Sequence, residues 1–266
     1  MPREKINNME LYYETYGEGD PLVMIMGLSA NIDWWPPTFL DIMKKNFEII
    51  VFDNRDAGRS ENVEENYELK DLAIDTVGLM DKLNIKKAHI LGISMGGMIA
   101  QELVLNYPER VNKLVLASTN CGNPKSILPS KRVLADLTKD REGRSEKEII
   151  EDFIDLLYTD KFIEENPDYI ENAKRRMMKA PIKPEAYQRQ IKAILTFNSG
   201  RRLKNIKAPT LVIHGKDDIL LPPKNAEIIA DAIPNAKLEY FEKSGHTLFS
   251  HQPEKVGQTV LNFLKN

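Results

Sequence analysis

Short apolar runs alternate with amphipathic stretches in both the first and the last part of the chain. Continuous apolar runs bounded by turn residues are typical of strands that are covered on both faces of a sheet. Apolar residues that recur every three or four positions are typical of helices with one buried face. The sequence predicts strands over residues 9–16, 22–26, 47–53, 87–93 and 113–118, and helices over 37–45, 69–83 and 98–106. Repeated strand–helix units indicate a mostly parallel, doubly wound α/β sheet with helices on both faces.

The alternation breaks in the region 122–202, where amphipathic segments separated by prolines replace the buried strand runs. Ser145 and Glu148 form a capping-box pattern that predicts the start of a helix. Asn166 before Pro167 predicts a second helix start, with Asn166 as the N-cap. Further elements are predicted as helices over 184–197, 223–232 and 253–264 and strands over 209–214 and 237–241. We therefore predict an α/β core of residues 1–121 and 203–266, with residues 122–202 inserted as a helical cap.

Composition and charge restrict the class of protein. Of the 266 residues, 42% are hydrophobic and 29% are charged, and the net charge of −3 gives no reason to expect nucleic acid or an anionic membrane as a partner. The single cysteine, Cys121, cannot form an internal disulfide, and the four histidines show no metal-ligand spacing, so neither a metal nor a cofactor is expected. The first residues lack the apolar core of a signal peptide, and no apolar run approaches the ~20 residues that span a membrane. We expect a cytoplasmic protein with a small-molecule partner, and the oligomeric state, a homodimer included, stays open.

A serine flanked by glycines stands between a predicted strand and a predicted helix. Gly92 and Gly96 lie two positions on either side of Ser94, and Gly97 follows them. Glycines lack the Cβ atoms that would collide where strand and helix nearly touch, and a serine in this tight turn holds its hydroxyl away from both elements. The simpler alternative is a serine that only caps the helix, but capping does not explain glycines on both sides. The pattern predicts that Ser94 is a nucleophile.

A serine nucleophile needs a base and an orienting acid, and two loops that follow predicted strands contain such groups. Loops at the carboxyl ends of parallel strands meet at one edge of a sheet. Asp217 and Asp218 follow the strand that ends at His214, and His246 follows the next strand. Neutral imidazole accepts a proton near neutral pH, and a carboxylate holds the ring in the required tautomer. We predict His246 as the base and Asp218 as the acid, with Asp217 as the alternative acid.

The other three histidines receive different interpretations. His89 lies inside a predicted strand and is expected in the core or next to the site. His214 ends a strand before a glycine turn and is expected to support the acid loop. His251 comes at the start of the last predicted helix and is expected at the surface or as a cap.

An oxyanion site requires two convergent N–H donors. We predict the backbone N–H of Met95, directly after the nucleophile, as one donor. The second predicted donor is the N–H of Leu28, which follows Gly27 at the end of a predicted strand. The alternative interpretation of Gly27 is a plain turn.

Apolar residues near these groups are candidates for contact with a substrate. Trp34 and Trp35 follow the predicted oxyanion loop, and packing in the core is the alternative for both. In the cap, the candidates are Phe153, Leu157, Tyr158, Met177 and Met178. Because apolar residues at helical spacing usually pack a helix onto its neighbours, packing is also the alternative for these five.

The motifs resemble those of the α/β-hydrolase superfamily over nearly the whole chain. Residues 92–97 are similar to its nucleophile elbow, 214–218 to its acid loop and 244–246 to its histidine loop. A carboxylesterase branch that includes methylesterases is resembled by residues 26–30 and 53–60 together with Trp34 and Trp35. A separate resemblance, to 3-oxoadipate enol-lactonases, is found in residues 108–111. Many members have His-Gly where this chain has Met26-Gly27, a departure that affects the polarity of the pocket and not the triad.

The residues and the resemblance together predict a serine hydrolase that cleaves carboxylic esters of small to medium acyl size through an acyl-enzyme on Ser94. The same triad on this fold also supports lactone opening, carbon–carbon bond hydrolysis and cofactor-free perhydrolysis, and these alternatives stay open. A non-enzymatic receptor for small molecules is a further class, which a complete triad disfavours.

Overall fold

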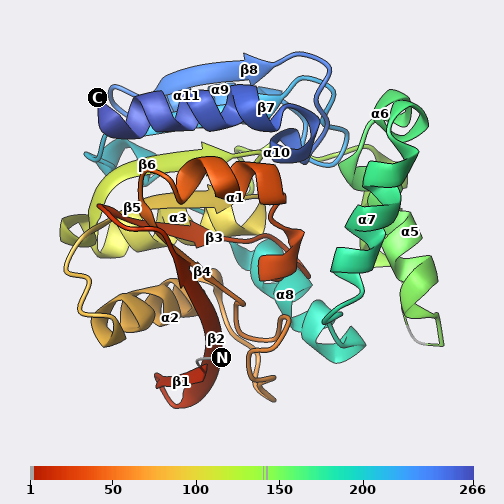
Figure 1. Cartoon of the computed structure of the whole chain (residues 1–266), viewed down its shortest axis with the longest axis horizontal. Coiled ribbons are helices and arrows are strands. Elements are labelled where there is room, and N and C mark those ends of the chain that lie inside the picture. The colour runs from red at the N-terminus through yellow and green to blue at the C-terminus, as the bar shows by residue number, and fades with distance from the viewer. Residues whose placement is uncertain (1–2, 140, 142) are drawn as a thin grey trace.

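Eight strands form one sheet in the computed structural model, which describes residues 3–139, 141 and 143–266. The strand order is β1-β2-β4-β3-β5-β6-β7-β8, with antiparallel pairing between β1, β2 and β4 and parallel pairing from β4 to β8 (Figure 1). The strands are β1 (Arg3–Ile6), β2 (Met9–Tyr16), β3 (Pro21–Ile25), β4 (Glu48–Phe52), β5 (Ala88–Ile93), β6 (Val111–Ala117), β7 (Thr210–Gly215) and β8 (Lys237–Phe241). The predicted mostly parallel α/β sheet is confirmed.

Helices cover both faces of the sheet because the central strands carry apolar side chains on both faces. One apolar layer joins the sheet to α2 (Leu69–Lys82), α3 (Met95–Asn106) and α9 (Lys224–Ala232). The opposite layer joins it to α1 (Pro37–Met43), α10 (Leu248–His251) and α11 (Pro253–Lys265). None of the helices in the described part of the chain is both long enough and apolar enough to cross a membrane. With both faces covered, the ends of the strands are the places where loops meet a ligand.

A group of helices follows between β6 and β7, and Figure 1 shows three of them, α5, α6 and α7, standing beside the sheet. The helices of this group are α4 (Lys131–Thr138), α5 (Glu146–Leu157), α6 (Asp160–Glu165), α7 (Pro167–Met177) and α8 (Pro184–Thr196). They share an apolar cluster in which Phe153, Ile170 and Tyr187 pack together and contact Leu220 of the core. The arrangement agrees with a helical insertion, whose limits at residues 122 and 202 stay a prediction.

Most differences from the predicted elements concern short segments. The strand β1 and the helices α4, α6 and α10 were not predicted, since each has at most eight residues and thus too few positions for a periodic pattern. The predicted capping box is confirmed, because the Ser145 hydroxyl accepts from the Glu148 N–H and the Glu148 carboxylate accepts from the Ser145 N–H. The predicted start of α7 is confirmed, with Asn166 at the N-cap position and Pro167 as the first helical residue. The Asn166 side chain does not make the capping hydrogen bond, because it donates to the Phe162 carbonyl one turn earlier.

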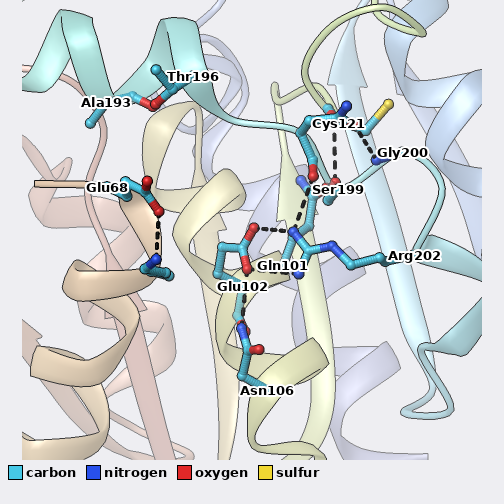
Figure 2. A network of polar contacts seen from close by, with 12 residues as sticks. Glu68, Gln101, Glu102, Asn106, Cys121, Ala193, Thr196, Ser199, Gly200 and Arg202 are labelled. Carbon is cyan, nitrogen blue, oxygen red and sulfur yellow. Dashed lines mark hydrogen bonds and ion pairs between the residues drawn. The ribbon is translucent and has the colours of Figure 1, made fainter.

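A polar network fixes α3 to the segment that returns from the inserted helices (Figure 2). The Gln101 side chain accepts a hydrogen bond from Ser199 Oγ at 2.7 Å and donates to the Asn120 carbonyl at 3.0 Å. Glu102, the next residue on the same helix, forms an ion pair with Arg202. Gln101 and Ser199 are fully buried, so losing either partner would leave an unpaired polar group in the core. The network therefore holds α3 firmly in place.

Candidate active site

Ser94 lies on a strained turn between β5 and α3. Its backbone has φ 57° and ψ −123°, a conformation that non-glycine residues rarely adopt and that costs on the order of 1–3 kcal/mol. A Cβ atom on Gly92 would lie 2.2 Å from the Gly96 carbonyl oxygen, and one on Gly96 would lie 2.1 Å from the Ile25 carbonyl oxygen. Strand and helix therefore approach as closely as the two glycines predict. The Ser94 side chain makes no cap hydrogen bond, which excludes the simple capping alternative.

The loop after β3 lies directly against Ser94. A Cβ atom on Gly27 would lie 3.0 Å from the Ser94 Cβ atom, so a larger residue at position 27 would press on the Ser94 side chain. Within the described residues, neither the Leu28 nor the Met95 N–H donates to a protein acceptor. The Met95 N–H also belongs to the first turn of α3, where the helix dipole favours negative charge. The structure thus places both predicted oxyanion donors beside the predicted nucleophile.

The ends of β7 and β8 bring the predicted acid and base together. Asp218 Oδ2 lies 2.8 Å from His246 Nδ1, and both side chains are buried. The other carboxylate oxygen, Oδ1, accepts from the backbone N–H groups of Leu220 and Leu221 at 2.9 Å each. Asp217 is exposed, which removes it as the alternative acid. With its Nδ1 directed to the carboxylate, the His246 ring is held with Nε2 free to act as a base.

His214 is a second histidine on the same carboxylate. Its Nε2 lies 3.0 Å from Asp218 Oδ2 and 2.9 Å from the Leu221 carbonyl oxygen, so Nε2 must carry the hydrogen. Burial by itself would raise the pKa of Asp218. The charge of His246 and the hydrogen bonds from both histidines outweigh this effect and hold the pKa of Asp218 below its ordinary value. Asp218 therefore stays ionised at neutral pH, as an orienting acid must.

One cavity of about 150 Å³ contains Ser94 and His246 in its lining. Ser94 Oγ and His246 make no hydrogen bond among the described residues; hydrogen bonds of this kind often tighten only when a substrate binds. The lining also includes two further polar residues, Asn120 and Thr247, and no Asp, Glu, Lys or Arg. Apolar side chains supply most of the remainder. The cavity therefore suits an uncharged, apolar group next to a reactive polar centre.

The predicted substrate contacts divide into two sets. Trp34, Phe153 and Leu157 line the cavity, and the Trp34 ring meets the Phe153 ring edge-on at 5.8 Å. The prediction for Trp35 is wrong, because this side chain is 1% exposed and packs on Phe39 and Phe249 beneath the sheet.

Three predictions in the inserted helices are wrong as well. Tyr158 turns away from the cavity and stacks on Phe162 and His251. Met177 lines a separate small cavity, and Met178 is exposed. Sequence spacing gives the face of a helix but not the neighbour that the face meets.

Other lining residues were missed because they lie in segments with no sequence signal for a site. Asn120 follows β6, and Thr247 directly follows the predicted base. The remaining missed residues come mostly from α4, α8 and the loops beside them: Leu128, Pro129, Leu134, Leu137, Ile191, Ile194 and Leu195, together with Met26, Ala30, Ile93, Met98, Leu220 and Leu221. A position beside a predicted site residue is the signal that could have identified some of this set, since Thr247 follows His246, Ile93 precedes Ser94, and Leu220 and Leu221 come shortly after Asp218.

The other two histidines lie away from the acid–base pair. His89 is buried near the start of β5 against the Phe47 ring, and burial lowers its pKa, which fits the expected core position. His251 does not begin the last helix but ends α10, and it is not a surface cap. Its Nε2 accepts from the Thr159 N–H at 3.3 Å, and its ring packs against Phe162 at 4.4 Å. His251 thus fixes the inserted helices to the histidine loop.

Comparisons with known proteins agree with the fold that carries this site. The sequence profile of a family described as alpha/beta hydrolase fold matches residues 20–253. A protein of Azorhizobium caulinodans assigned as a carbamate hydrolase is 26% identical, with 99% of this chain and 98% of that protein covered. A poly(3-hydroxyalkanoate) depolymerase of Ectopseudomonas oleovorans is 30% identical, with 92% and 84% covered. A solved structure of a thermophilic esterase of Thermogutta terrifontis with bound malate has a TM-score of 0.86 and 26% identity, with 100% of this chain and 98% of that chain covered.

Proposed function

Because the chain belongs to the α/β-hydrolase fold family, we propose that it is a serine hydrolase that cleaves carboxylic esters of small to medium acyl size. One observation carries the proposal: Ser94, on its strained turn, shares a cavity with His246, whose ring is held by Asp218. The similar proteins include a depolymerase of a hydroxyalkanoate polymer and an esterase, which supports ester chemistry, beside a protein assigned as a carbamate hydrolase.

The reaction follows from the position of each group. Ser94 Oγ attacks the ester carbonyl while His246 Nε2 takes its proton, and Asp218 stabilises the imidazolium that forms. The N–H groups of Leu28 and Met95 bind the oxyanion. His246 then returns the proton to the leaving alcohol, and a water activated by the same ring cleaves the acyl-enzyme. Because Ser94 Oγ and His246 make no hydrogen bond among the described residues, the proton transfer requires the two side chains to come closer together as the ester binds.

The cavity lining supports an uncharged substrate. A charged substrate group would lose its hydration in this cavity, and no charged side chain of the lining would compensate for the loss. Burying a charge in this way costs roughly several kcal/mol. An ester with an aliphatic acyl group loses no such hydration and gains from the contact of its methylene groups with Leu157 and Phe153.

The test combines covalent labelling with turnover. We expect a fluorophosphonate probe to label Ser94, identified by mass spectrometry of the peptide, and p-nitrophenyl butyrate to be hydrolysed. Ser94→Ala should lose the label and reduce turnover by a factor of roughly 10⁴ or more. Ser145→Ala, which removes an exposed helix cap away from the cavity, is the matched control and should behave as wild type in both assays.

Two results would contradict the proposal. Full activity of the Ser94→Ala variant would exclude the serine mechanism. Labelling of Ser94 without ester hydrolysis, but with opening of an enol-lactone or formation of a peracid, would assign the same triad to one of the alternative acyl reactions.

A further inference from the structure

Exposed apolar side chains gather at the mouth of the Ser94 cavity. Within the described residues, nine large hydrophobic side chains are exposed, and five of them lie in the segments that surround this cavity. Leu195 is 60% exposed, Leu128 is 54% exposed and Leu134 is 37% exposed, yet each of the three also lines the cavity. Ile127 and Ile219 are also exposed, and each directly precedes a lining residue in the sequence, Leu128 and Leu220 respectively. We call these five residues the apolar rim.

The apolar rim comes from three separate segments that the fold holds together. Leu128 and Leu134 belong to the start of α4 and the loop before it, Leu195 to the last turn of α8, and Ile219 to the acid loop. The first of these segments is fixed by Asn225 at the start of α9. The Asn225 side chain accepts from the Ile127 N–H at 2.8 Å and donates to the Ile127 carbonyl at 2.9 Å. These hydrogen bonds attach the first rim segment to α9. The rim is therefore a grouped surface and not a set of scattered exposed side chains.

The size of the cavity indicates what the rim contacts. Its volume of about 150 Å³ lies below the range of about 300–1,000 Å³ that is usual for small-molecule sites. A short acyl group fits inside, whereas a longer alkyl chain has to leave through the mouth. On the way out it would lie on Leu128, Leu134 and Leu195, whose side chains reach from the cavity to the surface.

We infer that the apolar rim binds the distal part of an alkyl chain that is too long for the cavity, and that the preferred substrates are esters of medium length, with an unbranched chain of about eight to ten carbons. This inference rests on the proposed ester hydrolysis and names its substrate class. The continuity of rim and cavity favours an alkyl chain over a flat partner surface, because three rim residues and Ser94 line the same cavity. A second copy of the chain or a lipid bilayer would cover the rim without extending to the nucleophile.

The experiment measures chain-length selectivity with p-nitrophenyl butyrate and p-nitrophenyl decanoate, both below the concentration at which they form micelles. A methylene that is fully buried changes affinity about fourfold, and a half-covered one on an open rim changes it about twofold. We expect kcat/KM of the wild type to rise at least about tenfold from butyrate to decanoate. Decyl acetate, compared with ethyl acetate, shows whether the chain on the rim belongs to the alcohol instead of the acyl group.

Rim variants identify the surface that is responsible. Leu128→Ser combined with Leu195→Ser should bring the decanoate-to-butyrate ratio close to one, and Ile219→Ser should lower the ratio less. Ile74→Ser is the matched control, because Ile74 is a similarly exposed side chain on α2 that does not line the cavity. This control should keep the wild-type ratio. Unchanged thermal unfolding of each variant shows that folding is intact.

Three outcomes would overturn the inference. One is a wild-type ratio at or below one for both ester series. Another is a ratio that the rim variants leave unchanged. The third is that the rim variants abolish dimerisation or binding to phosphatidylcholine vesicles but leave the decanoate-to-butyrate ratio of kcat/KM unchanged. Failure of the proposed ester hydrolysis itself has a different signature, namely no label on Ser94 and no butyrate turnover in any variant. In that case, calorimetry of decan-1-ol binding still tests the rim, because the wild type should bind this alcohol more tightly than the rim variants do.

Discussion

Replacing Gly92 by alanine is the sharpest test of how backbone packing positions the nucleophile. The added Cβ atom would lie 2.2 Å from the Gly96 carbonyl oxygen and 2.7 Å from the Gly97 nitrogen, both backbone atoms that cannot rotate away. Ordinary contact begins near 3.4 Å, so β5 and α3 must separate by about 1.2 Å at this point. Ser94 stands between these elements and moves with them.

This displacement has a cost in rate and a cost in stability. A shift of about 1 Å at a reacting group costs on the order of 100-fold in rate. Overpacking of this kind costs about 1–3 kcal/mol of folding free energy. We therefore expect Gly92→Ala to lower kcat for p-nitrophenyl butyrate about 100-fold, with a smaller change in KM, and to lower the midpoint of thermal unfolding.

A glycine with softer surroundings provides the control. A Cβ atom on Gly200 would meet the flexible Lys125 side chain at 3.1 Å and Cys121 Sγ at 3.3 Å, contacts that small side-chain movements relieve. Gly200→Ala should therefore keep nearly the wild-type kcat. Wild-type kcat and unfolding midpoint in the Gly92→Ala variant would refute the reasoning, because the predicted clash would then have been absorbed without moving Ser94.

The remaining predictions concern the acid and its two histidines. His214→Phe removes one hydrogen bond to the Asp218 carboxylate, a bond to a charged group worth about 1.5 kcal/mol, so kcat should fall about tenfold, and His214→Gln, which keeps a donor, should lose less. Because the pKa of Asp218 is lowered in the folded state, its ionised form stabilises the fold above the ordinary carboxyl pKa of about 3.9, and this contribution is lost as the pH falls below that value. Denaturation curves should accordingly show Asp218→Asn less stable than wild type at pH 7, with a difference that shrinks below pH ~4; a constant difference would contradict the assignment. Ester hydrolysis should rise with pH as a proton-accepting base becomes available, with no second acid step from Asp218, whose lowered pKa keeps it ionised. A flat rate from about pH 5 to 9 would exclude a histidine base.

The sequence by itself determined the α/β sheet, the position of Ser94 on a strained turn and the pairing of a base loop with an acid loop. These features follow from local rules. Apolar runs define strands that are covered on both faces, and glycines at fixed distances from a serine are needed wherever a strand and a helix nearly touch. The Gly92 and Gly96 contacts show that both rules apply in this chain.

Only the tertiary structure decided which of two adjacent aspartates faces His246, and which apolar residues reach the cavity. Asp217 and Asp218 differ in the side of the turn to which they point, and the chain around the turn sets that side. Trp35 and Tyr158 look as suitable as Trp34 and Phe153 in sequence, but they meet other aromatic rings. The exposed rim is made by segments from α4, α8 and the acid loop that are distant in sequence. Such contacts depend on how helices pack against one another, and spacing along a single chain segment does not contain that information.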